Sequence, residues 1–445
     1  MSAVEPEFVA TAPKGHLCFA DAVNSGVNGT GSLNGDTSYG IDRRTLANGT
    51  VVLARHIPDP DIVAVSIGIR GGSRFEDDAT AGAAKFMEKL FVQGTERRPG
   101  PDLVQRPLTI RGSGLSVGAG TEMVTFGAQV RSIDVEVMLD VLGDVLLHSR
   151  FAQDRVENEA RVILEELNAR RANPNVLASD LFSKAVFEGH PLARSAAGDL
   201  ENTPRLTRDT LVGYRDRHFV GRNTVVAVAG NLPVEEAHAR IADALGPMPA
   251  GETAPLSNVP APVLGARRID EKAGSAQARV LIGGQLPGLG SPDRFALAAA
   301  NAVLGGSGFR LFREIRDLRG LSYDPSPAMA QFPDAGIWLA AAGTDPTNVD
   351  TVIGLLTHEI DRLTEERLSD DDLSNAKNYL EGSLVVGLET PSAQSGQMIR
   401  DEVLGSPVLS RAHVEGIRAV TADDVQRVAR AYLRTDVATL VVVQP

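Results

Sequence analysis

Apolar residues recur along the chain with the spacings of regular secondary structure. Alternating or continuous apolar runs predict strands, and apolar residues three or four apart predict helices. Glycine, proline and asparagine separate these segments, as at the Asn48-Gly49 turn of an expected hairpin over residues 45–56. Further strands are predicted at 62–70, 114–120, 121–130, 224–229, 278–285, 336–343 and 437–443. Helices are predicted near residue 85 with Thr80 as N-cap, and at 133–148, 154–171, 233–245, 293–304, 309–318, 348–366, 369–384 and 421–433.

The order of these elements repeats on either side of a proline-rich segment. Residues 247–262 combine Pro, Ala, Gly and Ser with few charges, which predicts a linker. The segments before and after it both close with a helix and an apolar strand, so we predict a duplicated α+β unit in which each half is an antiparallel sheet flanked by helices. The expected limits are an irregular, Gly-, Asn- and Ser-rich extension at 1–40, a first half at 41–246 and a second half at 263–445.

Composition excludes several classes of function. The net charge of −13 argues against binding nucleic acid or an anionic membrane by bulk electrostatics, and no apolar run is long enough to span a membrane. The first residues lack the features of a signal peptide, and the single cysteine, Cys18, fits a reducing cytoplasm. We expect a cytoplasmic protein with neither nucleic-acid nor membrane partners, in which any functional charge is local.

One helical turn concentrates a rare residue. Only six of the 44 Lys and Arg residues are lysines, and two of these, Lys85 and Lys89, share a helical face with Glu88. The pattern is by itself typical of a solvated helix face with weak ion pairs. It is also the spacing at which a helix holds a metal when the outer residues are histidines, but an ammonium group has no lone pair to offer.

The sequence around this turn resembles a known family. Residues 71–74 read Gly-Gly-Ser-Arg, residues 85–89 read Lys-Phe-Met-Glu-Lys, and residues 94–98 read Gly-Thr-Glu-Arg-Arg. Together they resemble the pitrilysin family of inverted-motif zinc peptidases, in the branch that includes mitochondrial processing peptidase. The 76 residues between Lys89 and Glu166 also match, because the family takes a third ligand from a glutamate helix at that separation, with a second acidic position at Glu159. The resemblance covers roughly residues 40–445 and implies two homologous halves that form a clamshell.

The family's zinc site is expected to be absent from this chain. The resemblance implies histidines where Lys85 and Lys89 stand, with Glu166 as the third ligand and Glu88 as the general base. Only one possible ligand is left, so we expect no metal here and no hydrolysis at this site. We hypothesise that the two ammonium groups replace the +2 charge of zinc, because carboxylates about 4 Å apart repel by roughly 4 kcal/mol at an effective dielectric near 20.

Two further segments resemble the parts of the family that contact substrate. Arg310 and Tyr323, within Arg-Leu-Phe and Arg-Gly-Leu-Ser-Tyr, align with an arginine that anchors a substrate carbonyl and a tyrosine that donates to the developing oxyanion. Taken alone, this segment is typical of a capped helix with an arginine face. Residues Gly118, Ala119, Gly120 and Thr121 resemble the edge strand that binds substrate as an added strand, although such a run is also typical of an ordinary strand or turn.

These matches predict the non-zinc subunit of a heterodimeric peptidase. Some family members divide the machinery between two chains, so the expected partner is a homologous chain that bears His-x-x-Glu-His and the zinc, with Arg310 and Tyr323 acting in trans on a peptide. Two alternatives stay open. One is an inactive pseudopeptidase that scaffolds or binds peptides. The other is an independent enzyme with a lysine nucleophile, which the neighbouring carboxylates disfavour because they raise lysine pKa values.

Overall fold

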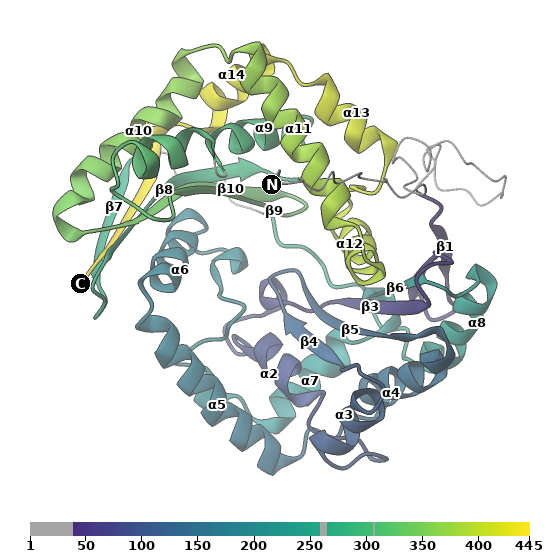
Figure 1. Cartoon of the computed structure of the whole chain (residues 1–445). Helices are drawn as coiled ribbons and strands as arrows, with labels where there is room; N and C mark the ends of the chain where they lie inside the picture. The colour runs from purple at the N-terminus through teal and green to yellow at the C-terminus, as the bar shows by residue number, and fades with distance from the viewer. Residues whose placement is uncertain (1–38, 259–264, 306–307) are drawn as a thin grey trace, which may run out of the picture.

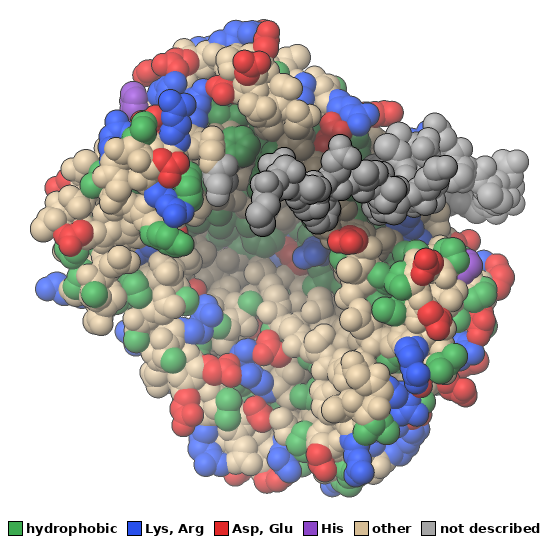
Figure 2. Space-filling view, in the orientation of Figure 1, with side chains coloured by type: hydrophobic (Ala, Val, Ile, Leu, Met, Phe, Trp, Pro, Cys, Tyr) green, Lys and Arg blue, Asp and Glu red, His purple; other side chains and the backbone are tan. Residues whose placement is uncertain are grey.

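The chain folds into two sheet-and-helix halves that face each other (Figure 1). The structure is a computed structural model that describes residues 39–258, 265–305 and 308–445. Nearly all of the predicted extension, with Cys18, lies outside these residues, as do the last part of the linker and residues 306 and 307. Both halves combine a sheet with flanking helices, so the predicted α+β class is confirmed. Figure 2 shows that the surface between the two halves is hollowed.

The first half contains a six-stranded sheet in the order β1-β2-β6-β3-β5-β4. Its central strand β3 has seven consecutive buried residues, because both faces of the sheet are covered. The predicted hairpin and the predicted pair of strands that follows the first helices are both present as antiparallel pairs. The strands are β1 (Asp42–Thr45), β2 (Val51–His56), β3 (Ile62–Arg70), β4 (Ser116–Ala119), β5 (Met123–Arg131) and β6 (Thr224–Gly230).

The second half contains a five-stranded sheet in the order β7-β11-β8-β10-β9. Its strands are β7 (Arg267–Lys272), β8 (Ala278–Pro287), β9 (Ser326–Gln331), β10 (Ala335–Thr344) and β11 (Thr439–Gln444). The two edge strands, β7 and β9, were not predicted. β7 reads RRIDEK, and its charges suit an unpaired edge but conceal the strand from an apolar pattern. β9 contains Pro327, which is tolerated at an edge.

The two sheets share one topology apart from the additional strand β1. Along β2-β6-β3-β5-β4 the neighbours pair parallel once and then antiparallel three times. The order β7-β11-β8-β10-β9 repeats these directions, which confirms the predicted duplication. The sheets are antiparallel as predicted, except for one parallel pair of strands in each half. The closing strand, β6 or β11, returns beside β2 or β7 only after several helices, and a long connection of this kind permits parallel pairing.

Helices cover both faces of each sheet. The expected helix at 309–318 is largely replaced by a π-helix at Phe312–Asp317, and helices α12 and α13 occupy a stretch for which none was predicted. The first half contributes α2 (Ala83–Leu90), α3 (Pro101–Thr109), α4 (Val135–His148), α5 (Gln153–Arg171), α6 (Pro174–Val186), α7 (Arg208–His218) and α8 (Val234–Leu245). The second contributes α9 (Arg294–Leu304), α10 (Val349–Glu365), α11 (Asp370–Gly387), α12 (Pro391–Leu404), α13 (Arg411–Ala419) and α14 (Ala422–Tyr432).

One helix of each half packs against the sheet of the other half. Phe182 of α6 is buried with Leu281 in the second sheet, and Met398 of α12 is buried with Met123 in the first (Figure 1). Full burial of a side chain of this size contributes about 1.5–3 kcal/mol. This reciprocal exchange fastens the two halves together.

Each half also has a hydrophobic core of its own. One core runs from Val52 to Met248 and combines the first sheet with its helices. The other runs from Ala278 to Val442 and does the same for the second sheet. We propose that the halves extend over residues 41–246 and 263–445, with the linker between them.

Candidate functional site

The helix that carries the two lysines begins at a buried carboxylate. Its N-cap is Gly82, with φ of 95°, and Glu76 Oε2 and Oε1 accept hydrogen bonds from the amides of Gly82 and Ala84 at 2.9 and 2.8 Å. The predicted cap Thr80 is therefore wrong, because its hydroxyl bonds to Asp77 instead. Burial raises the pKa of Glu76 to about 7, although these two backbone hydrogen bonds act in the opposite direction.

The lysines lie on the only polar face of α2, and this face is turned toward α5. The other residues of the helix have no exposed surface and anchor it in the core: Ala83, Ala84, Phe86, Met87 and Leu90. The side chains of Lys85, Glu88 and Lys89 are only 13, 20 and 23% exposed. The interpretation as a fully solvated helix face is therefore wrong.

Lys85, Glu88, Lys89 and Glu166 form one ion-pair network, here called the lysine cluster. Lys85 Nζ lies 2.6 Å from Glu88 Oε1 and 3.3 Å from Glu166 Oε2. Lys89 Nζ lies 2.6 Å from Glu166 Oε1 and 3.8 Å from Glu88 Oε1. Each ammonium thus contacts both carboxylates, and the spacing of 76 residues does bring Glu166 to the lysine turn.

These contacts shift the pKa values of the cluster in opposite directions. Burial lowers the pKa of Lys89, but the hydrogen bond and charge of Glu166, with the charges of Glu88 and Glu159, outweigh it and leave the pKa raised. Burial raises the pKa of Glu166, but its contacts with Lys89 and Lys85 outweigh it and leave the pKa lowered. Glu159 lies two turns earlier on α5, and its pKa is raised chiefly by burial. Lys89 and Glu166 are therefore both charged near neutral pH.

The lysine cluster does not fit zinc. Protein zinc sites need at least three thiolate, imidazole or carboxylate donors, whereas the groups beside Glu88 and Glu166 are ammonium groups that carry no lone pair. Throughout the part of the chain that the structure describes, no group of three or more His, Cys, Asp or Glu residues is placed to hold a metal ion. No chemistry at this turn is therefore derived through a metal.

Removal of both lysines is expected to destabilise the fold. Lys85→Met/Lys89→Met preserves the length of the side chains but leaves Glu88 and Glu166 without cations, at a Coulomb cost of up to roughly 4 kcal/mol. Because these groups are partly exposed, we expect a loss of about 2 kcal/mol, measured in thermal unfolding as a Tm several degrees lower. The control Lys184→Met/Lys272→Met removes the same charge from two exposed lysines and should leave Tm unchanged. An unchanged Tm in the first variant would contradict the role of the lysines as a replacement for the charge of zinc.

This loss of stability should depend on pH. Because the Glu166 pKa is lowered from its usual value of 4.5, its contribution is present above pH 4.5 and is lost as the pH falls through the folded pKa. Because the Lys89 pKa is raised from 10.5, its contribution is complete below pH 10.5 and is lost as the pH rises through the folded pKa. The Tm difference between the unaltered chain and Lys85→Met/Lys89→Met should be largest at about pH 5–10 and should shrink below about pH 4. Thermal melts across this range test the expectation, and a constant difference down to pH 3 would contradict it.

Glu88 also contacts the edge strand of the first sheet. Its Oε2 accepts a hydrogen bond from the backbone amide of Ala119 in β4 at 3.0 Å. Of the four residues predicted to bind substrate along a strand, only Gly118 and Ala119 lie in β4. Gly120 and Thr121 lie in the turn toward β5, so the strand prediction is wrong for these two.

The flanking Gly-Gly-Ser-Arg motif holds this turn in place. The amides of Ser73 and Arg74 donate to the carbonyl oxygens of Gly120 and Thr121 at 3.1 and 3.0 Å. A Cβ atom on Gly72 would lie 2.3 Å from the Gly120 oxygen, so the close approach requires glycine. The carbonyl groups of the turn thus each accept a backbone hydrogen bond from this motif.

The side chain of Arg74 joins the turn to the second half. Its guanidinium is only 1% exposed and forms ion pairs with Glu122 at 2.7 Å and with Asp334 at 2.5 Å. It also donates to the carbonyl oxygen of Ser257 in the linker at 3.1 Å. Since Asp334 lies between β9 and β10, Arg74 connects both halves beside the edge strand.

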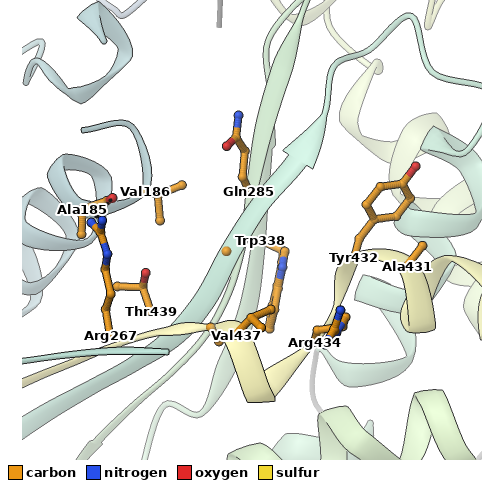
Figure 3. Close-up of a pocket in the computed structure, with 12 residues that line it drawn as sticks. Ala185, Val186, Arg267, Gln285, Trp338, Ala431, Tyr432, Arg434, Val437 and Thr439 are labelled. Atoms are coloured by element: carbon orange, nitrogen blue, oxygen red, sulfur yellow. Dashed lines mark hydrogen bonds between the residues drawn. The ribbon is translucent and has the colours of Figure 1, made fainter. Parts of the chain in front are cut away.

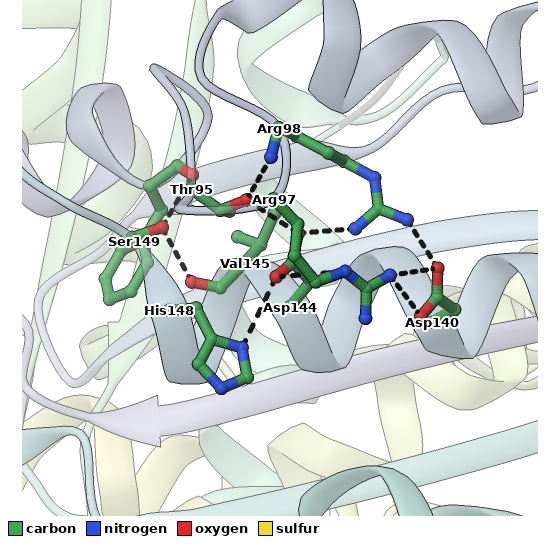
Figure 4. Close-up of polar contacts among 9 residues, drawn as sticks. Thr95, Arg97, Arg98, Asp140, Asp144, Val145, His148 and Ser149 are labelled. Carbon is green, nitrogen blue, oxygen red and sulfur yellow. Dashed lines mark hydrogen bonds and ion pairs between the residues drawn. The ribbon is translucent and has the colours of Figure 1, made fainter.

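The second flanking motif, Gly94-Thr95-Glu96-Arg97-Arg98, fastens the end of α2 to α4 (Figure 4). The Thr95 hydroxyl donates to Asp144 Oδ2 at 2.7 Å and accepts from the Arg98 amide at 2.8 Å. Arg98 forms ion pairs with Asp140 and Asp144. Because the Asp144 side chain has no exposed surface, these contacts supply the cations that a buried carboxylate needs. This motif therefore positions α2.

Arg310 and Tyr323 lie apart from the lysine cluster. Arg310 Nη2 donates to Asp372 Oδ2 at the start of α11 at 3.1 Å, and its buried Nη1 has no partner among the described residues. Tyr323 is 79% exposed, with the Arg316 guanidinium carbon 4.4 Å from its ring centre. Within residues 39–258, 265–305 and 308–445, no hydrogen bond or ion pair links Arg310 to Tyr323 or either of them to the cluster. Among the described residues, the two predicted sets of site residues therefore make no hydrogen bond or ion pair with each other.

A pocket of about 220 Å³ lies elsewhere, at one end of the second sheet. Figure 3 shows Trp338 between Arg267 on one side and Arg434 on the other. Both arginines already have carboxylate partners, Glu188 at 3.0 Å and Asp436 at 2.5 Å. The pocket contains none of the predicted site residues, and its cations are already neutralised.

Comparisons with known proteins give the same assignment to both halves. Residues 51–200 match the family described as insulinase (peptidase family M16), and residues 205–380 match the one described as peptidase M16 inactive domain. An uncharacterized zinc protease of Mycobacterium leprae is 30% identical over 419 residues, which cover 92% of this chain and 93% of the relative. The chain belongs to peptidase family M16. The predicted family resemblance is thereby confirmed.

Other M16 proteins extend the comparison. A probable mitochondrial-processing peptidase subunit beta of Arabidopsis thaliana is 28% identical over 404 residues, covering 87% of this chain and 75% of the relative. A crystal structure described as a peptidase M16 inactive domain from Pseudomonas fluorescens has a TM-score of 0.83 at 21% identity, covering 91% of this chain and 98% of that one, which bears on the fold alone. Among the described residues of this M16 chain, no helix is long and apolar enough to cross a membrane.

Sequence reasoning missed three partners of the M16 site residues. Glu76 caps α2, Ala119 donates to Glu88, and Asp372 holds Arg310. Asp372 had a visible signal, because it belongs to an acidic run after Ser369, whose hydroxyl caps α11. Glu76 and Ala119 had no signal in the sequence, because each contact depends on how distant segments pack.

Proposed function

We propose that this M16 chain is the non-zinc subunit of a heterodimeric metallopeptidase that processes or degrades peptides. The observation that carries the proposal is a contrast between the two predicted sets of residues. The positions that correspond to the zinc site are filled by a network of ion pairs between two lysines and two glutamates. Arg310 and Tyr323 keep groups that nothing else in the described chain uses.

Arg310 suits the role of holding a substrate carbonyl. Asp372 contacts one guanidinium nitrogen and orients the group, while the Nη1 donors have no partner among the described residues. A guanidinium has five N–H donors in a fixed plane, so one carboxylate contact leaves donors for a peptide oxygen. Because Nη1 is buried in the chain as described, the proposed complex requires the Arg310 side chain to turn toward a peptide in the partner's site.

Tyr323 suits the role of a donor to the oxyanion. Its ring is held by Arg316, and its exposure of 79% is unusual for a large aromatic side chain. Exposed aromatic residues are enriched where proteins bind partners. A phenol directed at developing negative charge stabilises a transition state without needing to ionise.

The proposed partner is a homologous chain that bears His-x-x-Glu-His and holds the zinc. A heterodimer of this kind assigns the metal to one chain and the Arg310–Tyr323 pair to the other. The net charge of −13 gives no basis for a nucleic-acid partner, and we place the complex in the cytoplasm.

A second candidate is an inactive pseudopeptidase that scaffolds or binds peptides. The neutralised lysine cluster favours it to the same degree, because neither function needs metal in this chain. A lysine nucleophile is disfavoured, because the raised pKa of Lys89 keeps that amine protonated near neutral pH.

The experiment that tests the proposal is co-purification with a homologue of His-x-x-Glu-His type, ideally one encoded beside this chain, followed by a zinc count for each chain. We expect a stable heterodimer with zinc in the homologue and none in this chain. Stoichiometric zinc on this chain alone, or no association between the two, would contradict the proposal.

A further inference from the structure

The carboxylate of Glu88 joins two parts of the molecule. Its Oε1 lies 2.6 Å from Lys85 Nζ, and its Oε2 accepts the amide of Ala119 at 3.0 Å. Lys85 in turn contacts Glu166 at 3.3 Å, and Glu166 is held by Lys89 at 2.6 Å. Lys85 therefore holds the Glu88 carboxylate beside Ala119, and movement of the carboxylate away from Ala119 would disturb its ion pair with Lys85.

Ala119 lies at the free edge of the first sheet. β4 is the last strand of its sheet and pairs only with β5. The Gly120 amide donates to the Met123 oxygen at 2.9 Å, which makes these two a hydrogen-bonded pair. In an antiparallel ladder such pairs alternate, so Ala119 and Val117 direct their backbone groups away from β5.

We propose that Glu88 is a stopper that keeps the edge of β4 closed to an added peptide strand. An extended peptide that joins an edge strand uses the outward N–H and C=O groups of that strand. At Ala119 the N–H already has a carboxylate acceptor, which is stronger than the peptide carbonyl that would replace it. The ligand that Glu88 excludes is thus the backbone of an extended peptide, whatever its side chains.

This role of Glu88 gives the lysine cluster a second function in addition to stabilising the fold. Lys85 holds the Glu88 carboxylate in the position from which it contacts Ala119, and an inward charge at an exposed edge also prevents unwanted pairing between sheets. The inference rests on the proposed function for its biological meaning, because a subunit that serves a partner's site should not retain the peptide on its own edge.

Three substitutions of Glu88 distinguish the effect of its side-chain length from the effect of its charge. Glu88→Asp keeps the negative charge near Lys85 but is one methylene too short to reach Ala119. Glu88→Gln keeps an acceptor for the Ala119 amide and loses the charge. Glu88→Ala loses both. All three are compared with the unaltered chain by thermal unfolding, so that any variant that does not fold is recognised.

The first measurement is hydrogen exchange at the Ala119 amide in this chain alone. We expect exchange at least about tenfold faster in Glu88→Asp and Glu88→Ala, the change that corresponds to about 1.4 kcal/mol, and slower exchange in Glu88→Gln than in either. The Val117 amide, which Glu88 does not contact, should exchange equally in all four proteins. An Ala119 amide that stays equally protected in a folded Glu88→Asp would overturn the inference.

The second measurement is binding of a short fluorescein-labelled peptide, uncharged and rich in threonine and valine, followed by anisotropy. Glu88→Asp and Glu88→Ala should bind it at least about tenfold more tightly than the unaltered chain, at about 1.4 kcal/mol per factor of ten. Unchanged affinity despite a released Ala119 amide would equally overturn the inference. Neither measurement involves the zinc-bearing partner. A negative result here would therefore not bear on the trans role of Arg310 and Tyr323. Likewise, a negative result for that trans role would not bear on the stopper.

Discussion

Lys85→His/Lys89→His is expected to bind one zinc ion per chain, where the unaltered chain binds none. The two positions lie one turn apart on α2, and both lysines contact Glu166 of α5, so the backbone already brings three positions to one point. Two imidazoles and the Glu166 carboxylate would form a three-donor set of the kind that zinc accepts in proteins. Zinc at about a thousand times its Kd should raise the free energy of unfolding by about 4 kcal/mol, as a rise in Tm beside a metal count near one.

Two matched variants show whether this zinc is held by the intended residues. Adding Glu166→Gln removes the third donor and should abolish both the metal and the rise in Tm. Lys184→His/Lys272→His adds the same number of histidines at two exposed positions that are far apart in sequence and should bind no stoichiometric zinc. If Lys85→His/Lys89→His folds and still binds no zinc, α2 and α5 no longer have the spacing of a metal site.

Arg310→Ala and Tyr323→Phe are each expected to lower the turnover of the proposed heterodimer by about 10²–10³-fold, the usual effect of removing one donor to a transition state. The zinc content and the assembly of the pair should not change. Because the guanidinium also holds the substrate, Arg310→Ala should raise KM as well, whereas Tyr323→Phe should act mainly on kcat.

Neighbouring residues supply the controls for these two substitutions. Arg319→Ala removes an exposed arginine whose partner is Glu314, and Tyr379→Phe removes the hydroxyl of another exposed tyrosine. Both should leave peptide hydrolysis unchanged. Full activity of the pair with Arg310 and Tyr323 both replaced would remove the trans role and leave only the scaffold.

The sequence predicted those parts of the molecule whose signals are local or tied to a fixed spacing. The apolar pattern gave the limits of β3 correctly, and the Asn48-Gly49 turn correctly indicated a hairpin, although β1 begins at Asp42, three residues before the predicted start. The 76-residue spacing, taken from the resemblance to the family, correctly placed Glu166 beside Lys89.

The rest depends on contacts that no local pattern contains. The charged edge strand β7 and the parallel pairs arise only once the sheet is assembled. The exchange of α6 and α12 between the halves joins residues far apart in the chain. The hydrogen bond from the Ala119 amide to Glu88 depends on how closely the turn between β4 and β5 approaches α2. The contacts of Gly72 and Arg74, which belong to a third segment of the chain, fix the position of that turn.

The central claim is that this chain supplies residues to a zinc site in another chain. The most direct measurement is a titration of the purified zinc-bearing homologue with this chain, followed by hydrolysis of a fluorogenic peptide. We predict that neither protein cleaves the peptide alone and that activity rises with added chain to a plateau at one-to-one stoichiometry. Equal cleavage by the homologue alone, with no response to this chain, would contradict the claim.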